Sequence, residues 1–285
     1  LLALRSFISE ASTEEALMQL DSNDSIVRVA ALSKLEGLPP AARFSKVVSL
    51  LDDPVRAVRT EAARILSSVP DSLFTTSQRQ RFDQVYQELK TRYTSNLDRA
   101  ESHLSLGILS EQQGSFREAE KHYRNAIIRD DLFVPARMNL ATMLSGQGRG
   151  AEAETLLRDA LRIQPTWGQI HYSLGLLLAE NTDRLPEAIR SLERAAGYWP
   201  ENPRVNFNLA IAYWQNKRVE DAVRSFEQCI RMQPDNPEFR QRVSELLAQN
   251  DRWSEALPHL RHLNALLPDR PDLQSFLKQA EQYTK

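Results

Sequence analysis

The feature that most constrains the fold of this chain is a motif that recurs at nearly constant spacing from about residue 100 onward. Five alanines mark the motif, and successive members are 34, 35, 34 and 34 residues apart. They are Ala119, Ala153, Ala188, Ala222 and Ala256. The spacing of 35 reflects one extra residue within residues 181–186. A period of this length is typical of repeat proteins, in which each unit packs against its neighbours.

Two further positions keep the same period. A bulky residue follows each alanine by four places: Tyr123, Leu157, Leu192, Phe226 and Leu260. A proline closes four of the units, and an aspartate takes its place in the first: Asp131, Pro165, Pro200, Pro234 and Pro268. Apolar residues in each unit lie three and four apart, which predicts helices with one apolar face. Because proline cannot continue a helix, each unit is expected to end there.

Small residues mark the points where the two helices of a unit are expected to cross. They occur in the pairs Leu106-Gly107, Leu140-Ala141, Leu174-Gly175 and Leu209-Ala210. A small side chain lets antiparallel helices approach to about 8–10 Å. Gly114 and Gly148 are expected to form the turn between the two helices. One hairpin cannot bury its own apolar faces, so the sequence predicts an all-α solenoid of stacked antiparallel helical hairpins.

Five such units over residues 100–270 resemble the tetratricopeptide repeat family. The resemblance implies a superhelix in which the first helices of the hairpins line a concave surface. Two departures from the family pattern are Ser110, where a tyrosine is usual, and Val243-Ser244, where Leu-Gly or Leu-Ala is usual. Residues 271–285 are expected to form a helix that caps the apolar end of the array.

A shorter repeat lies near the N-terminus. Leu20-Asp21, Val27-Arg28, Ala31, Leu35 and Pro39 reappear 31 residues later as Leu51-Asp52, Val58-Arg59, Ala62, Leu66 and Pro70. This motif resembles the second helix of HEAT-type repeats. We therefore expect HEAT-like helices over residues 1–75 and a connecting helix over residues 76–99. Leu1, Leu2, Leu4 and Phe7 favour the interior of a helix, so the chain is expected to be part of a longer one.

Composition and charge argue against two classes of partner. The net charge of −2 gives no electrostatic basis for binding a phosphate backbone, so we expect no nucleic acid partner. No apolar run approaches the roughly 20 residues of a membrane-spanning helix, so we expect no membrane insertion. The single cysteine, Cys229, excludes an internal disulfide and occupies a position that is alanine in sister units. It is therefore expected to be a small core residue rather than a nucleophile.

The sequence does not indicate catalysis. His259 and His262 lie one helical turn apart, but no cysteine or carboxylate cluster accompanies them, so solvated surface histidines are expected rather than a metal site. Gly146, Gly148 and Gly150 are spaced like a phosphate-binding loop, yet they lie between two helices rather than after a strand. We therefore expect a chain that is not an enzyme and holds no metal and no cofactor.

Candidate partner-binding residues follow from the tetratricopeptide resemblance, which implies which positions of the first helices face the concave surface. They are Leu104, Met138, Asn139, Tyr172, Leu176, Phe207, Asn208, Ile211 and Trp214. Exposed apolar and aromatic side chains are typical of interaction surfaces, and asparagine amides can pair with a peptide backbone. The alternative is that four aliphatic side chains of these helices only pack against neighbouring helices: Leu104, Ile108, Leu176 and Ile211.

Two known kinds of tetratricopeptide binding site can be compared with these candidate positions. The two asparagines, Asn139 and Asn208, resemble rungs of the asparagine ladder in O-linked N-acetylglucosamine transferases. Carboxylate-clamp repeats that hold heat-shock protein C-termini carry lysine and asparagine where this chain has Leu104 and Ile108. The clamp function is therefore disfavoured.

These observations favour a non-catalytic scaffold that binds a protein or peptide partner, with the oligomeric state left open. The alternative is an accessory arm of a larger protein whose active domain lies upstream of residue 1. Residues 26–32 and 53–59 resemble the C-terminal portion of bacterial multihaem c-type cytochromes. That resemblance implies a periplasmic location; without it, a cytoplasmic location is expected.

Overall fold

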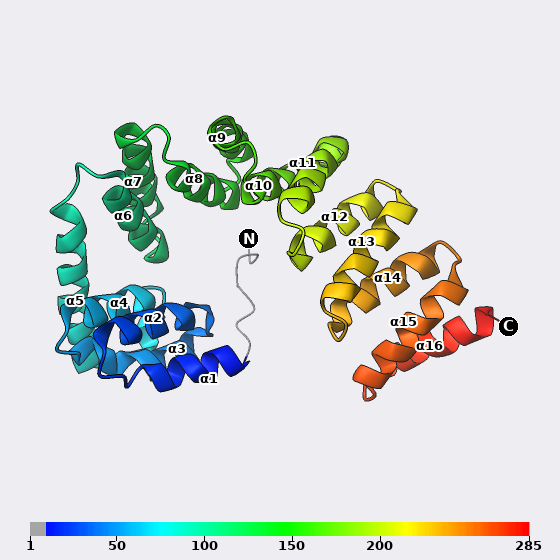
Figure 1. Cartoon of the computed structure of the whole chain (residues 1–285), viewed down its shortest axis with the longest axis horizontal. Helices are drawn as coiled ribbons and strands as arrows, with labels where there is room; N and C mark the ends of the chain where they lie inside the picture. The colour runs from blue at the N-terminus through cyan, green and yellow to red at the C-terminus, as the bar shows by residue number, and fades with distance from the viewer. Residues whose placement is uncertain (1–9, 285) are drawn as a thin grey trace. The chain divides into compact units, whose positions relative to one another are not determined.

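The computed structural model describes residues 10–284, and every regular element in this range is a helix (Figure 1). Sixteen α-helices are present in the described residues, joined by turns and a few short 3-10 helices. This confirms the predicted all-α solenoid class. The expected helix around Leu1, Leu2, Leu4 and Phe7 lies outside the described residues. The chain divides into two compact units, Leu1–Arg149 and Gly150–Lys285, and each is described by itself.

The first part of unit 1 contains five helices around one apolar core. They are α1 (Glu10–Gln19), α2 (Ser25–Lys34), α3 (Pro40–Val47), α4 (Arg56–Leu66) and α5 (Thr76–Thr94). Leu32, Ile65 and Phe82 are fully or almost fully buried in this core. Side-chain caps define two helix starts, because Asp24 accepts the amide of Ile26 at 2.8 Å and Thr75 caps α5.

A buried ion pair connects α2 to the segment before α4. Arg28 binds Asp53 through two hydrogen bonds, Nε–Oδ2 at 2.9 Å and Nη2–Oδ1 at 3.0 Å. The Arg28 and Asp53 side chains are only 12% and 6% exposed. Arg28 Nη1 also donates to the carbonyl of Ser22 at 2.6 Å, and Asp53 Oδ1 accepts the amide of Val55 at 2.8 Å. The pair therefore joins the two segments that the 31-residue repeat aligns.

Unit 1 continues with α6 (Ala100–Gln112), α7 (Phe116–Arg129) and α8 (Val134–Gly146). The small residue at the crossing of α6 and α7 is confirmed, because a Cβ on Gly107 would lie 2.5 Å from the ring of Tyr123. The turn after α6 is also as expected: Gly114 has φ +72°, a left-handed conformation that favours glycine.

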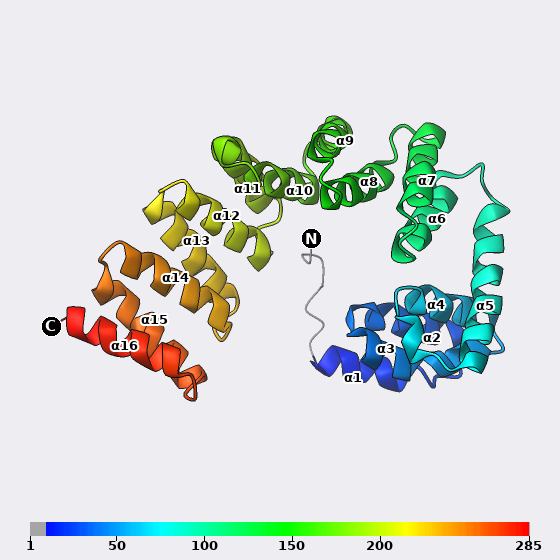
Figure 2. The same ribbon diagram turned by 180° about the vertical axis from the view of Figure 1, so that it is seen from behind.

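Unit 2 contains the remaining eight helices, which pack in chain order (Figure 1 and Figure 2). They are α9 (Gly150–Ile163), α10 (Gly168–Ala179), α11 (Leu185–Tyr198), α12 (Pro203–Gln215), α13 (Val219–Met232), α14 (Pro237–Gln249), α15 (Trp253–Leu266) and α16 (Pro271–Tyr283). A Cβ on Gly175 of α10 would lie 2.7 Å from Leu192 Cγ on α11, so this crossing also requires a small residue. Helices α9, α11, α13 and α15 each end two residues before the predicted closing proline.

The turns within the hairpins adopt two backbone conformations, a left-handed residue or a short 3-10 helix. Gly114 and Gly148 are left-handed, and so are Lys217 (φ 60°) and Asp251 (φ 58°) at the same repeat position. The third hairpin instead forms a short 3-10 helix, Thr182–Arg184, where the sequence has its extra residue. The insertion is therefore absorbed in the turn, and α10 and α11 keep their close crossing.

Arginines before the second helices connect consecutive hairpins at the surface. In unit 1, Arg149 Nη1 binds Glu120 Oε2 at 2.7 Å; in unit 2, Arg184 Nη1 binds Glu154 Oε2 at 2.6 Å. The hydrogen bond from Arg149 lowers the pKa of Glu120 to about 2, and the one from Arg184 lowers the pKa of Glu154 to about 2. These pairs help to fix the register between neighbouring repeats. The division into HEAT-like, connecting, tetratricopeptide and capping parts stays a prediction.

Candidate partner-binding surface

In unit 2, the candidate residues lie on α10 and α12 and are mostly packed into the core. Tyr172 is only 5% exposed, whereas Phe207 and Trp214 are half-buried. The Phe207 ring lies 5.4 Å from Phe239 of α14, and the Trp214 ring lies 6.4 Å from Phe226 of α13. Leu176 and Ile211 are also half-buried against this core. The packing alternative therefore accounts for part of each side chain, and Leu176, Phe207, Ile211 and Trp214 each keep some surface exposed.

The amide of Asn208 is used within unit 2 rather than left free. Its Nδ2 donates to the Tyr172 hydroxyl at 2.6 Å and to the carbonyl of Arg204 at 3.1 Å. Burial raises the pKa of Tyr172, and the bond from Asn208 opposes that rise. The donor of the Asn208 amide is therefore occupied within the fold, and pairing of this amide with a peptide backbone stays a prediction for its oxygen alone. Its Oδ1 accepts no hydrogen bond from the described residues.

In unit 1, the three candidates Leu104, Met138 and Asn139 have different surroundings. Leu104 is half-buried beside Ala100, Ala126 and Ala136. Met138 is only 7% exposed, so the expectation of an exposed methionine is wrong, as it is for Tyr172 in unit 2. Helix-to-helix packing explains this burial, because a first helix contacts its own hairpin and the next one. Asn139 lines a cleft.

This cleft, which we call the Glu111 cleft, lies among α6, α7 and α8 and has a volume of about 480 Å³. It is lined by Ile108, Glu111, Gln112, Phe116, Tyr123, Asn139 and Thr142. The hydroxyl of the buried Tyr123 donates to Glu111 Oε2 at 2.6 Å, and Asn139 of α8 lines the same cleft. Burial raises the pKa of Glu111, while the bond from Tyr123 lowers it. Burial and the neighbouring carboxylate raise the pKa of Tyr123 strongly.

Among the residues that line this cleft, Asn139 is the one that belongs to the candidate set. Ile108 and Thr142 lie at the repeat position of the candidates Leu176 and Ile211, so the period already marks them as residues of the inward-facing stripe. Glu111 carries a second signal, because other units have Ser145, Ala179, Trp214 or Ala248 at this repeat position. The pairing of Glu111 with a tyrosine of the second helix depends on three-dimensional packing, which the period alone does not reveal.

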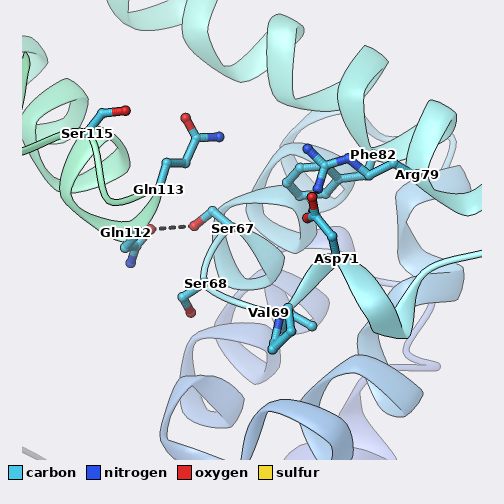
Figure 3. A pocket seen from close by; sticks show the side chains of 10 residues that line it. Ser67, Ser68, Val69, Asp71, Arg79, Phe82, Gln112, Gln113 and Ser115 are labelled. Carbon is cyan, nitrogen blue, oxygen red and sulfur yellow. Dashed lines mark hydrogen bonds and ion pairs between the residues drawn. The ribbon is translucent and has the colours of Figure 1, made fainter.

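A second hollow of about 480 Å³ lies between the end of α4, the start of α5 and the turn after α6 (Figure 3). Ser67 donates to Gln112 across it, and Arg79 pairs with Asp71 beside Phe82 (Figure 3). Arg79 Nε also binds Asp83 at 3.1 Å, so its charge is already balanced by two carboxylates. The wall therefore offers hydroxyls and amides but no unbalanced charge with which to select a ligand.

Of the two histidines expected at the surface, one is largely buried. His259 is 15% exposed with Nε2 3.1 Å from Glu227, so the expectation of a solvated side chain is wrong for it, whereas His262 is 42% exposed. Burial lowers the pKa of His259. In unit 1, His103 and His122 meet through their Nδ1 atoms at 3.1 Å, and burial lowers the pKa of both. Within residues 10–284, no group of three or more His, Cys, Asp or Glu is placed to hold a metal ion.

Cys229 is fully buried and packs in the core of unit 2. Its Sγ lies 3.4 Å from the carbonyl oxygen of Pro203, and burial raises the thiol pKa to about 12. The prediction of a small core residue is confirmed.

Among the described helices, none is long and apolar enough to cross a membrane.

Comparisons with known proteins give one curated relative and several solved structures. A segment of 117 residues is 28% identical to protein O-mannosyl-transferase Tmtc3 of Drosophila melanogaster, and the match covers 41% of this chain but only 13% of that protein. YrrB, described as a TPR protein with an unusual peptide-binding site, superposes with a TM-score of 0.55 at 17% identity, over 67% of this chain and 96% of YrrB.

MamA is a second structural neighbour, with a TM-score of 0.55 at 17% identity, over 61% of this chain and 94% of MamA. The MamA of Desulfovibrio magneticus RS-1 gives 0.54 at 17% identity, over 60% and 96%. At these identities the solved structures support the fold. Sequence profiles of the tetratricopeptide repeat match residues 96–166 and 172–237, and a further one matches 214–280, which together is more than half of the chain. This chain belongs to the tetratricopeptide repeat family.

Proposed function

We propose that this chain is a non-catalytic scaffold that binds a protein or peptide partner along the first helices of its hairpins. The observation that carries the proposal is the half-buried apolar surface of Leu176, Phe207, Ile211 and Trp214 on the adjacent helices α10 and α12. Partly exposed aromatic and aliphatic side chains beside a few polar atoms are typical of interface cores. The description of YrrB as carrying a peptide-binding site supports the same use of this fold.

The individual contacts proposed for unit 2 follow from this packing. Trp214 and Phe207 can give a partner their exposed edges without leaving the core, and such anchored aromatic rings lose little side-chain entropy on binding. The free Oδ1 of Asn208 can accept one amide of an extended segment, since its Nδ2 is held by Tyr172. In unit 1, Leu104, Met138 and Asn139 remain proposed contacts, of which Asn139 faces the Glu111 cleft.

A transferase activity is not part of the proposal. The curated relative is named a transferase, but this chain spans only 13% of its length. The single thiol of the chain, Cys229, is fully buried, and its raised pKa keeps it protonated at neutral pH. The cytochrome-arm alternative, with the periplasmic location it implies, stays a prediction that Cys-x-x-Cys-His motifs upstream of Leu1 would support.

The proposal can be tested with variants of unit 2. We would capture partners from a lysate with the wild-type chain and with Ile211→Ser/Trp214→Ala, and identify them by mass spectrometry. Tyr198→Ala is the matched control, because it removes an exposed aromatic ring from the second helix α11 of the same unit. Loss of partners by the double variant alone is expected. If the folded double variant retains every partner, the proposed surface is wrong.

A further inference from the structure

The Glu111 cleft contains a carboxylate that the fold leaves without a counter-charge. Glu111 is the only charged side chain among the seven lining residues. One of its oxygens accepts the Tyr123 hydroxyl at 2.6 Å, and no arginine or lysine pairs with it in the part of the chain that the structure describes. Glu120 and Glu154, on second helices of the hairpins, each bind two arginines instead.

Comparison between repeats shows that the hairpin fold does not require this carboxylate. The other units have Ser145, Ala179, Trp214 and Ala248 at the position of Glu111. They have Leu157, Leu192, Phe226 and Leu260 at the position of Tyr123. In the fourth hairpin the same two positions hold the contacting rings of Trp214 and Phe226, so an apolar pair satisfies the same geometry. The hairpin packing therefore does not require the polar pair of the first hairpin.

The cleft has the chemistry of a site for a basic side chain. Burial disfavours the ionised form of Glu111, and a cation at hydrogen-bond distance would reverse this effect. Ile108 lines the approach with apolar surface, and the Phe116 side chain is 47% exposed at the same cleft. These groups suit the methylene stem of a lysine or arginine, and an aromatic face also attracts the charged end. A volume of about 480 Å³ lies within the usual range of ligand sites.

We propose that the Glu111 cleft binds a lysine or arginine side chain of the partner, with Glu111 as its counter-ion. This inference rests on the proposed function, because it specifies the chemistry of a segment that the scaffold binds. Tyr123 is a positioning residue in this arrangement, since its hydroxyl fixes one carboxylate oxygen and leaves the other for the ligand. Asn139 of α8 lines the same cleft, so residues of two consecutive hairpins form its wall.

The direct test uses short peptides as probes and the whole chain as receptor. We would titrate acetyl-Ala-Ala-Lys-Ala-Ala-amide, and the same peptide with norleucine in place of lysine, into protein labelled with ¹³C at isoleucine methyl groups. The Ile108 methyl resonance is expected to shift saturably with the lysine peptide. The norleucine peptide keeps the stem without the charge and is expected to bind at least tenfold more weakly. Equal shifts by both peptides, or no Ile108 shift at about 10 mM peptide, would overturn the inference.

Two variants that each remove one negative charge measure how much the Glu111 carboxylate contributes to peptide binding. Glu111→Gln keeps the side-chain shape and an oxygen for Tyr123, so the fold is expected to persist while affinity for the lysine peptide falls at least tenfold. Glu101→Gln is the matched control, because it removes one charge from the exposed start of the same helix. If Glu111→Gln binds the lysine peptide as well as Glu101→Gln does, the inference is wrong.

The two proposals fail in different ways. If the Ile211→Ser/Trp214→Ala variant loses its partners but the lysine and norleucine peptides bind alike, the scaffold proposal is supported and the Glu111 cleft does not select a basic side chain. If the lysine peptide binds through Glu111 but the double variant keeps every partner, the Glu111 cleft is supported and the proposed surface on α10 and α12 is wrong.

Discussion

The buried pair of Arg28 and Asp53 gives the sharpest stability prediction. Asp53→Asn leaves the Arg28 guanidinium 12% exposed and without a counter-charge, while the amide oxygen can still accept the bond from Val55. Removing one partner of a buried ion pair costs about 3–5 kcal/mol, so we expect the local free energy of opening to fall by at least about 3 kcal/mol. Such a loss corresponds to amide hydrogen exchange roughly 100-fold faster in α2 and α4.

The assay can separate this loss from a general loss of stability. All four tryptophans lie in unit 2: Trp167, Trp199, Trp214 and Trp253. Hydrogen–deuterium exchange of α2 and α4 peptides therefore reports on unit 1, and tryptophan fluorescence during urea unfolding reports on unit 2. The exchange is expected to change much more than the fluorescence transition.

A second variant tests the electrostatic origin of the effect. Arg28→Met/Asp53→Asn removes the buried charge together with its partner, so it is expected to recover part of the lost protection. Two outcomes would refute the reasoning: a change below about 1 kcal/mol for Asp53→Asn, or a double variant as unstable as the sum of the two single variants.

Three further predictions concern the hairpins. Gly175→Ala places a Cβ 2.7 Å from Leu192 and is expected to lower the free energy of unfolding of unit 2 by about 1–3 kcal/mol. Urea unfolding followed by tryptophan fluorescence measures this change, and an unchanged midpoint would contradict the prediction. Lys217→Gly removes the side chain from a left-handed residue at φ 60° and is expected to raise the free energy of unfolding of unit 2 by about 0.5–1 kcal/mol. A lower unfolding midpoint would show that Lys217 causes no strain in the turn. His103 and His122 have pKa values lowered by burial, so as pH falls below about 6.5 the unfolded chain gains protons first and stability decreases. His122→Gln is expected to flatten the pH dependence of unit 1 stability below that pH, and an unaltered slope would exclude the pair as its source.

The fold was predictable because its determinants are local and periodic. Gly107 and Gly175 lie at crossings where no side chain fits, and Gly114 and Gly148 take the left-handed backbone of the turns. These requirements act at a fixed position in every unit, so the 34-residue spacing reveals them. Lys217 does not indicate a left-handed residue by its type, and Asp251 does so only weakly, so the repeat position that they share with Gly114 and Gly148 is the signal that identifies them.

The candidate surface was predicted less completely, for a physical reason. The period indicates which way a side chain points, but its exposure depends on the residues of the next helix. Neighbouring helices bury Met138 and Tyr172, although both occupy repeat positions that the family resemblance places on the concave side. The donor of Asn208 is taken by Tyr172, 36 residues away in the sequence. The Glu111 cleft depends likewise on which side chain of α7 reaches α6.

The 3-10 turn Thr182–Arg184 has a practical consequence for work on this molecule. Asn181, Thr182 and Asp183 are exposed, and Asn181 Oδ1 accepts the amide of Asp183 at 3.0 Å, so the turn is closed by its own atoms. It already accommodates one more residue than the equivalent turns without disturbing the close crossing of α10 and α11. Doubling the length of a flexible loop costs only about 0.6 kcal/mol. An affinity tag or a fluorophore-bearing peptide can therefore be inserted at Thr182–Arg184. The natural insertion would then serve as an attachment point for imaging and capture.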